Sequence, residues 1–160
     1  MRLALAVLIA LAGTSSAMAD VFGVVAGTVQ ERAAGVERVA QSLGVAFEKS
    51  RPKSNDYFDV LVAGRSRTVP ELSSAEARID RRSGRIRLLL LGVDPATHCT
   101  PRTEVIQRFG EPRDMNTPSA RQPAGSPTFY IYRYPWGDLR VGVAPDRPQC
   151  VTTIVTEFND

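Results

Sequence analysis

Residues that could carry covalent catalysis are few in this sequence. A Ser or Cys nucleophile normally needs a general base, most often a histidine, and His98 is the single histidine of the chain. Paired carboxylates could act as acid and base in glycoside hydrolysis. The pairs Glu71/Glu76 and Glu104/Glu111 are examples, but nothing in their setting selects them from the 17 acidic residues. Phosphate-binding, nucleophile-elbow, zinc-protease and EF-hand motifs are absent, so we expect no catalytic residue and no cofactor.

A row of aromatic side chains could instead recognise another molecule. Side chains of a strand alternate between its two faces, so one face of segment 129–136 carries what we call the aromatic row: Tyr130, Tyr132, Tyr134 and Trp136. If Phe129 and Ile131 pack on a helix, the aromatic row lies on the open side of the sheet. Tyr, Trp and Arg anchor protein interfaces because each joins a large apolar area to a polar tip. We therefore predict a recognition surface made of the aromatic row and Arg140; the alternative is that the tyrosines pack inward against the helices.

Arginines are concentrated in the first half of the chain, at Arg65, Arg67, Arg78, Arg81, Arg82, Arg85 and Arg87. Guanidinium groups suit carboxylates and phosphates. If these arginines converge at one end of the first sheet, they form an anion-binding surface for lipopolysaccharide phosphate or an acidic protein, with Arg65, Arg67, Arg81, Arg82 and Arg85 as its main members. The alternative is a solvated hairpin tip whose arginines keep the protein soluble and protect a sheet edge.

The first nineteen residues have the order of a cleavable secretory signal. Arg2 precedes an apolar run over residues 3–12, and small residues end in Ala17-Met18-Ala19, which predicts cleavage after Ala19; an uncleaved anchor is the alternative. The apolar run is shorter than the roughly 20 residues of a membrane span, so we expect a periplasmic or secreted protein that does not span the membrane. Without Arg2, 19 basic residues face 17 acidic ones, a balance too even to argue for nucleic acid.

The two cysteines, Cys99 and Cys150, predict one disulfide. An even number of cysteines in an exported chain favours a bridge, because disulfides persist in oxidising compartments. The alternative is metal ligation together with the adjacent His98. Two thiols and one imidazole without CxxC or HxxxH spacing fall short of the ligands that zinc needs, so we expect no metal site.

Residues 20–93 predict a helical segment followed by strands. Thr28 and Glu31 have the spacing of a capping box, which predicts a helix that begins at Thr28. Gly35 could kink or split this helix, and Gly44 ends it. Its apolar face is formed by Val36, Val39, Ala40 and Leu43.

Strands are predicted over residues 57–62, 75–80 and 85–91, with a hairpin turn at 81–84. The run Leu88–Leu91 is apolar on both faces, which is typical of a strand covered on both sides.

Residues 94–160 predict the same order again. Thr100 is a candidate cap with Pro101 in the first helical position, and Gly110 ends the helix. A loop over 118–127 precedes strands at 129–134, 139–143 and 151–158, with a turn at 145–148. We therefore predict an α+β fold of two tandem helix-plus-meander units, 20–93 and 94–160, that form one antiparallel sheet with the helices on one face. Chance similarity between the halves is the alternative.

Part of this pattern resembles a known family. Residues 103–112, which end in Gly110-Glu111-Pro112, together with the aromatic strand at 130–132 and the hairpin strand at 139–143, resemble the SmpA/OmlA (BamE) outer-membrane lipoproteins. The tandem arrangement is similar to the β-lactamase inhibitor protein family, in which two such units lie side by side. The chain differs from the first family in lacking a lipid-bearing Cys after its signal, and from the second in having a disulfide in the second unit only.

The resemblance implies a binding or assembly role outside the cytoplasm, without catalysis. We therefore expect an exported binding module that acts through protein–protein recognition, as an inhibitor of another envelope protein or as an assembly factor for it. The alternatives are an envelope hydrolase that uses unidentified carboxylates and a purely structural periplasmic domain.

Overall fold

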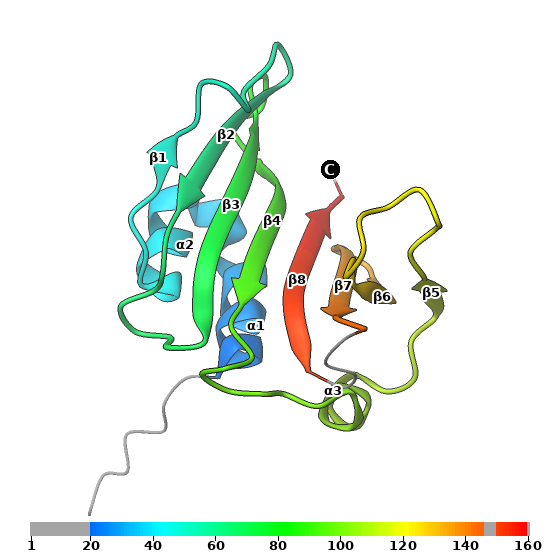
Figure 1. Cartoon of the computed structure of the whole chain (residues 1–160). Coiled ribbons are helices and arrows are strands. Elements are labelled where there is room, and N and C mark those ends of the chain that lie inside the picture. The colour runs from blue at the N-terminus through cyan, green and yellow to red at the C-terminus, as the bar shows by residue number, and fades with distance from the viewer. Residues whose placement is uncertain (1–19, 146–149, 160) are drawn as a thin grey trace, which may run out of the picture.

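A single antiparallel sheet organises the chain. The computed structural model describes residues 20–145 and 150–159 (Figure 1), and within them eight strands pair in the order β1-β2-β3-β4-β8-β7-β6-β5. The strands are β1 (Glu48–Lys49), β2 (Phe58–Ala63), β3 (Leu72–Asp80), β4 (Ile86–Val93), β5 (Asp114–Asn116), β6 (Thr128–Tyr134), β7 (Gly137–Val143) and β8 (Val151–Phe158). The helices are α1 (Val21–Glu31), α2 (Val36–Leu43) and α3 (Arg102–Phe109), with a 3₁₀ turn η1 (Arg32–Ala34) after α1. The α+β class is confirmed. The predicted secretory signal at 1–19 and most of the predicted turn at 145–148 lie outside the described residues.

Helix α1 begins seven residues earlier than its predicted start at Thr28. Asp20 caps it by accepting a 2.6 Å hydrogen bond from the Gly23 amide. Thr28 lies inside the helix, fully buried, and its hydroxyl donates to the Val25 carbonyl at 2.8 Å. The prediction was wrong because a threonine hydroxyl can also be satisfied by the preceding turn of its own helix, so capping-box spacing alone does not define a helix start.

Two glycines act as predicted: Gly35 splits the helical segment, and Gly44 ends it. Gly35 has a φ of 98° and separates α2 from η1. Gly44 ends α2 in the left-handed conformation, with φ 63° and ψ 36°, and a Cβ at this position would lie 2.0 Å from the Thr68 hydroxyl oxygen. Both the conformation and the close approach therefore require glycine.

The hydrophobic core lies between the helices and one face of the sheet. In Figure 1, α1 and α2 lie behind β2, β3 and β4. Helix α3 covers the same side, because the Phe109 ring packs against Phe22 of α1 and Tyr132 of β6, with ring centroids 5.3 and 5.6 Å apart. The largest fully buried side chains include Leu43, Leu72, Leu89, Leu91, Leu139 and Ile154. Burial of this apolar surface is the main source of the stability of such a layer.

The predicted disulfide is confirmed. Cys99, just before α3, is bonded to Cys150, just before β8, across a separation of 51 residues. The alternative of metal ligation with His98 is wrong, because both thiols are consumed by the bridge. Within residues 20–145 and 150–159, none of the helices has the length and hydropathy of a bilayer-spanning segment.

Candidate functional site

The face of the sheet turned away from the helices carries the candidate site. Val60 of β2 and Val155 of β8 are only 3% and 8% exposed, yet neither belongs to the core cluster beneath the helices. Strand register places Val60 beside Arg78, and Val155 beside Leu90 and Arg140. No helix of the described residues packs on these side chains, so we call this side the open face.

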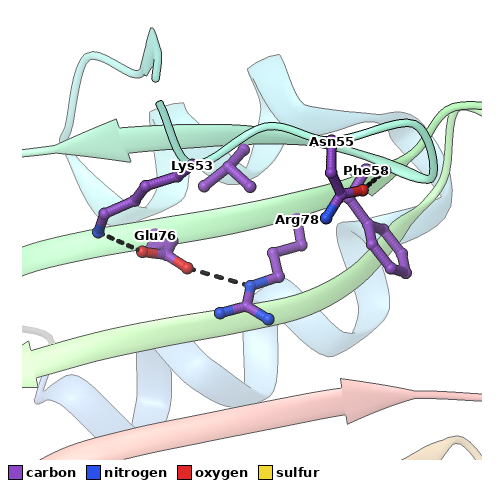
Figure 2. A pocket seen from close by; sticks show the side chains of 6 residues that line it. Lys53, Asn55, Phe58, Glu76 and Arg78 are labelled. Carbon is purple, nitrogen blue, oxygen red and sulfur yellow. Dashed lines mark hydrogen bonds and ion pairs between the residues drawn. The ribbon is translucent and has the colours of Figure 1, made fainter. Parts of the chain in front are cut away.

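A hollow of about 330 Å³ lies on the open face above β2 and β3, lined by Lys53, Asn55, Phe58, Val60, Glu76 and Arg78. Figure 2 shows Lys53 and Arg78 reaching Glu76 from two sides, in front of the strands and away from the helix ribbon. The Lys53 ammonium lies 2.7 Å from one carboxylate oxygen of Glu76, and Arg78 Nε lies 3.1 Å from the other.

Glu76 is held ionised by its two cationic neighbours. Burial by itself raises the pKa of this carboxyl, but hydrogen bonds from Lys53 and Arg78 more than offset it, and the net pKa lies below the ordinary value of 4.5. A general acid needs the opposite, a pKa raised toward the working pH. The geometry therefore suits a structural ion pair rather than a proton donor.

Glu71 and Glu76, which the sequence offered as one example of paired carboxylates without selecting them, lie in two different places. Glu71 accepts a 2.7 Å hydrogen bond from the Val21 amide at the beginning of α1, whereas Glu76 lies in the hollow on the open face. The two carboxylates thus bind different elements.

A second hollow of about 230 Å³ continues the first across the sheet. Its lining is Phe58, Arg78, Arg87, Leu88 and Glu157, so it shares Phe58 and Arg78 with its neighbour. We call the two together the open-face hollow. It spans β2, β3, β4 and β8, and its lining combines apolar side chains with charges of both signs.

Of the residues predicted for recognition, Arg140 is placed on the open face. It pairs with Ile131 and Val155 in the sheet, and its guanidinium contacts Glu157 at 2.5 Å and Asp138 at 3.6 Å. Glu157 therefore connects Arg140 to the rim of the open-face hollow.

The aromatic row lies on the other side. Tyr132 is 4% exposed and packs on Phe109, and Tyr130, Tyr134 and Trp136 pack against the same core cluster. The expectation that the row lies on the open side, together with Arg140, is wrong in this respect. Leu139 and Arg140 are neighbours on β7, so pairing Tyr132 with Leu139 necessarily turns Arg140 to the opposite face.

Each member of the aromatic row has a distinct neighbour. The Tyr132 hydroxyl is buried without a hydrogen-bond partner among the described residues, and burial raises the pKa of this phenol above 10.0. The Arg102 guanidinium lies 5.0 Å from the Tyr130 ring centroid. Tyr134 and Trp136 stack on each other, with centroids 5.1 Å apart and planes inclined by 10°.

The predicted convergence of arginines is also wrong. Arg65 and Arg67 lie in the loop before β3, where Arg65 pairs with Asp94 at 2.8 Å. Arg81, Arg82 and Arg85 lie in the hairpin after β3, where Arg81 pairs with Asp59 at 2.7 Å. Strand β3 has nine residues, which separates its ends by about 30 Å at the usual rise per residue. A strand between two groups of arginines keeps them apart.

Sequence reasoning missed Phe58 and Leu88 as site residues and named Glu76 only as one of several possible paired carboxylates. The run Leu88–Leu91 contained a usable indication, because a strand that buries alternate residues under helices has no need of four leucines. Leu89 and Leu91 face the core, whereas Leu88 and Leu90 are half-buried on the open face. The pattern indicated apolar surface on both faces, but not that one face lacks a cover.

Comparison with known proteins leaves the chain without an assigned family. No protein-family model matches it, and no curated protein is similar enough to count as a match. Among solved structures, the DUF4309 family protein YjgB from Bacillus subtilis subsp. subtilis str. 168 is similar, with 14% sequence identity over 78% of each chain and a TM-score of 0.48. A likeness of this extent assigns no function.

Proposed function

We propose that this protein is an exported binding module that recognises a partner protein through the open-face hollow, as an inhibitor of that partner or as a factor in its assembly. The observation that supports this proposal is the arrangement of apolar and charged side chains on that surface. Phe58, Val60 and Leu88 supply its apolar surface, and Arg78 lies between Val60 and Leu88 in the sheet, with Lys53, Glu76 and Glu157 also in the lining. Protein interfaces combine apolar surface with polar groups, and their energy is concentrated in a few anchors, among which arginine is common.

The charges favour a protein partner over a uniformly anionic surface. The open-face hollow carries carboxylates and cations side by side, and the side chains of Arg78 and Glu157 are 47% and 49% exposed. Alternating charges of this kind select a partner of complementary pattern and suppress wrong ones. A phosphate-rich surface would meet repulsion from Glu157.

We further propose that the chain consists of two tandem units, residues 20–93 and 94–160. Each unit has helix first and four strands next, and the strand order β1-β2-β3-β4 is followed across the sheet by its mirror order β8-β7-β6-β5. The units would then join where β4 pairs with β8. The open-face hollow includes this junction, since it is lined by Leu88 of β4 and Glu157 of β8.

Export to the periplasm or beyond is part of the proposal. Two independent features support it: residues 1–19 have the order of a secretory signal, and the Cys99–Cys150 disulfide suits an oxidising compartment.

The test compares two charge reversals on one sheet face. Arg78→Glu changes the open-face hollow, and Arg133→Glu is the matched control, an exposed arginine of β6 that lies four strands away across the sheet. Wild-type protein and both variants, with equal melting temperatures, are used as baits for cross-linked proteins from an envelope extract under oxidising conditions. We expect a protein that wild type and Arg133→Glu retain and that Arg78→Glu loses at least tenfold. Retention of the same proteins by all three baits, or none by wild type, would overturn the proposal.

A further inference from the structure

An apolar groove lies on the helix side of the molecule, away from the open face. Its volume is about 410 Å³, within the roughly 300–1,000 Å³ of small-ligand pockets. One wall is α1, the other is the end of α3, and the floor comes from β6, β7 and the turn between them. Its lining is Phe22, Val25, Ala26, Val29, Gln30, Phe109, Tyr134, Trp136 and Leu139. Gln30 is the single non-aromatic polar residue in this lining.

The groove exists because the helix layer is uneven. Helices α1 and α2 lie together over the first four strands, whereas the eight-residue α3 is the one helix described for the remaining strands. The stacked pair of Tyr134 and Trp136 is therefore left half-buried beside α1. Two of the four residues in the aromatic row therefore form a flat apolar wall of the groove. No side chain of the described residues covers this wall.

A basic hollow adjoins this groove. It has a volume of about 340 Å³ and is lined by Arg32, Ala33, Arg85, Ile86, Arg87, Phe158 and Asn159. Three of these residues are arginines and none is acidic. Arg32 uses one guanidinium nitrogen to donate to the Val29 carbonyl of its own helical segment, which leaves further N–H donors of its fork for an anion.

Ring contacts connect the groove to the hollow. The Trp136 ring lies 5.7 Å from the Phe158 ring between centroids, and the Arg32 guanidinium lies 5.2 Å from the Phe158 centroid. The Asn159 amide donates to the Trp136 carbonyl at 3.0 Å. Contacts through the buried Phe158 ring therefore link the stacked rings of the groove to the Arg32 guanidinium of the basic hollow.

We propose that the groove and the basic hollow together bind a single-chain amphipathic anion, a fatty-acid carboxylate, with its alkyl chain along Tyr134 and Trp136 and its carboxylate at Arg32 and Arg85. An uncharged alkane would leave the arginines unused, and a small anion would leave the aromatic wall bare. Guanidinium forks match carboxylates in geometry and charge, and each methylene that leaves water adds to the favourable free energy of binding. The groove lies on the helix side, the basic hollow shares Arg87 with the open-face hollow, and this inference does not depend on the proposed function.

Trp136 is the only tryptophan in the chain, so its fluorescence reports directly on the groove. The experiment titrates the mature, disulfide-bonded protein with octanoate, decanoate and dodecanoate below their micelle-forming concentrations, with calorimetry for the affinity. We expect Trp136 emission to change and the dissociation constant to fall several-fold with each pair of added methylenes. Decyltrimethylammonium, with the same tail and the opposite charge, should bind at least tenfold more weakly than the carboxylate.

Variants separate the two parts of the site. Arg85→Gln removes a charged donor of the basic hollow and should weaken decanoate binding about tenfold, the scale of one charge-assisted hydrogen bond. Arg82→Gln, an exposed arginine of the same hairpin that lies outside the hollow, should leave binding unchanged. Ala26→Phe fills the groove without adding a second tryptophan and should abolish the fluorescence response. Equal effects of Arg85→Gln and Arg82→Gln, affinity independent of chain length, or equal binding of the cationic amphiphile would each overturn the proposal.

Discussion

Arg108 donates two hydrogen bonds of 2.7 Å to the carboxylate of Asp20, which lies 88 residues earlier in the chain. Asp20 is the N-cap of α1, and Arg108 lies in the last turn of α3. The same guanidinium lies 5.4 Å from the Phe22 ring centroid. One ion pair therefore connects the two helices that form the walls of the apolar groove.

Substituting Asp20 or Arg108 should measure how much this ion pair stabilises the folded protein. Asp20→Ala removes the helix cap and the ion pair together, and we expect it to lower the free energy of unfolding by about 1–2 kcal/mol. Arg108→Gln leaves the cap and should cost no more than about 1 kcal/mol, because the pair is partly exposed and such pairs are weak. Urea denaturation of both variants is the measurement. A larger loss for Arg108→Gln than for Asp20→Ala would contradict this account.

The same pair predicts a loss of stability in acid. The hydrogen bond from Arg108 holds the pKa of Asp20 below its ordinary value of 3.8 in the folded protein. A lowered folded pKa means that the stabilisation is complete above pH 3.8 and disappears as the pH falls through the lowered value, because the unfolded chain then binds the proton more readily. Unfolding free energies measured between pH 6 and pH 2 should decline in the acid range. The decline should be shallower in Arg108→Gln, and identical slopes would exclude a contribution from this pair.

Tyr132 should behave as a core residue. Tyr132→Ala leaves a cavity beside Phe109 and should destabilise by about 3–5 kcal/mol, as for other large aromatic deletions in cores. Tyr132→Phe removes a buried hydroxyl that has no hydrogen-bond partner among the described residues, so stability should stay the same or rise by about 1 kcal/mol. Thermal and urea unfolding of the two variants measure these changes in stability. A marked loss of stability in Tyr132→Phe would mean that the hydroxyl has a partner in solution.

The disulfide should account for a large share of the stability. Closing a loop across 51 residues restricts the unfolded chain and should contribute about 4 kcal/mol in the chain-entropy estimate. Reduction, or the double variant Cys99→Ser and Cys150→Ser, should lower the urea midpoint accordingly. The double variant serves as its own control, because added reductant should not change its unfolding curve.

Some features of the fold follow from local pattern. The strand at residues 151–158 was predicted with both boundaries correct, and Gly44 was predicted to end a helix, because alternation and left-handed glycine are properties of short segments. Strands β1 and β5 were missed. They have two and three residues, all exposed, so no apolar alternation marks them, and their pairing with β2 and β6 alone makes them strands.

By itself, the sequence determined the α+β class, the disulfide and the two-faced character of residues 129–136. Only the tertiary structure decided which face is buried. Tyr130 and Tyr132 turn to the helices while Ile131 and Arg140 turn away, although either assignment satisfies the same alternation. The deciding contact is that of Tyr132 with Phe109 of α3, some twenty residues away. A period of two divides a strand into two sets of side chains, and packing against distant segments alone selects the set that leaves water.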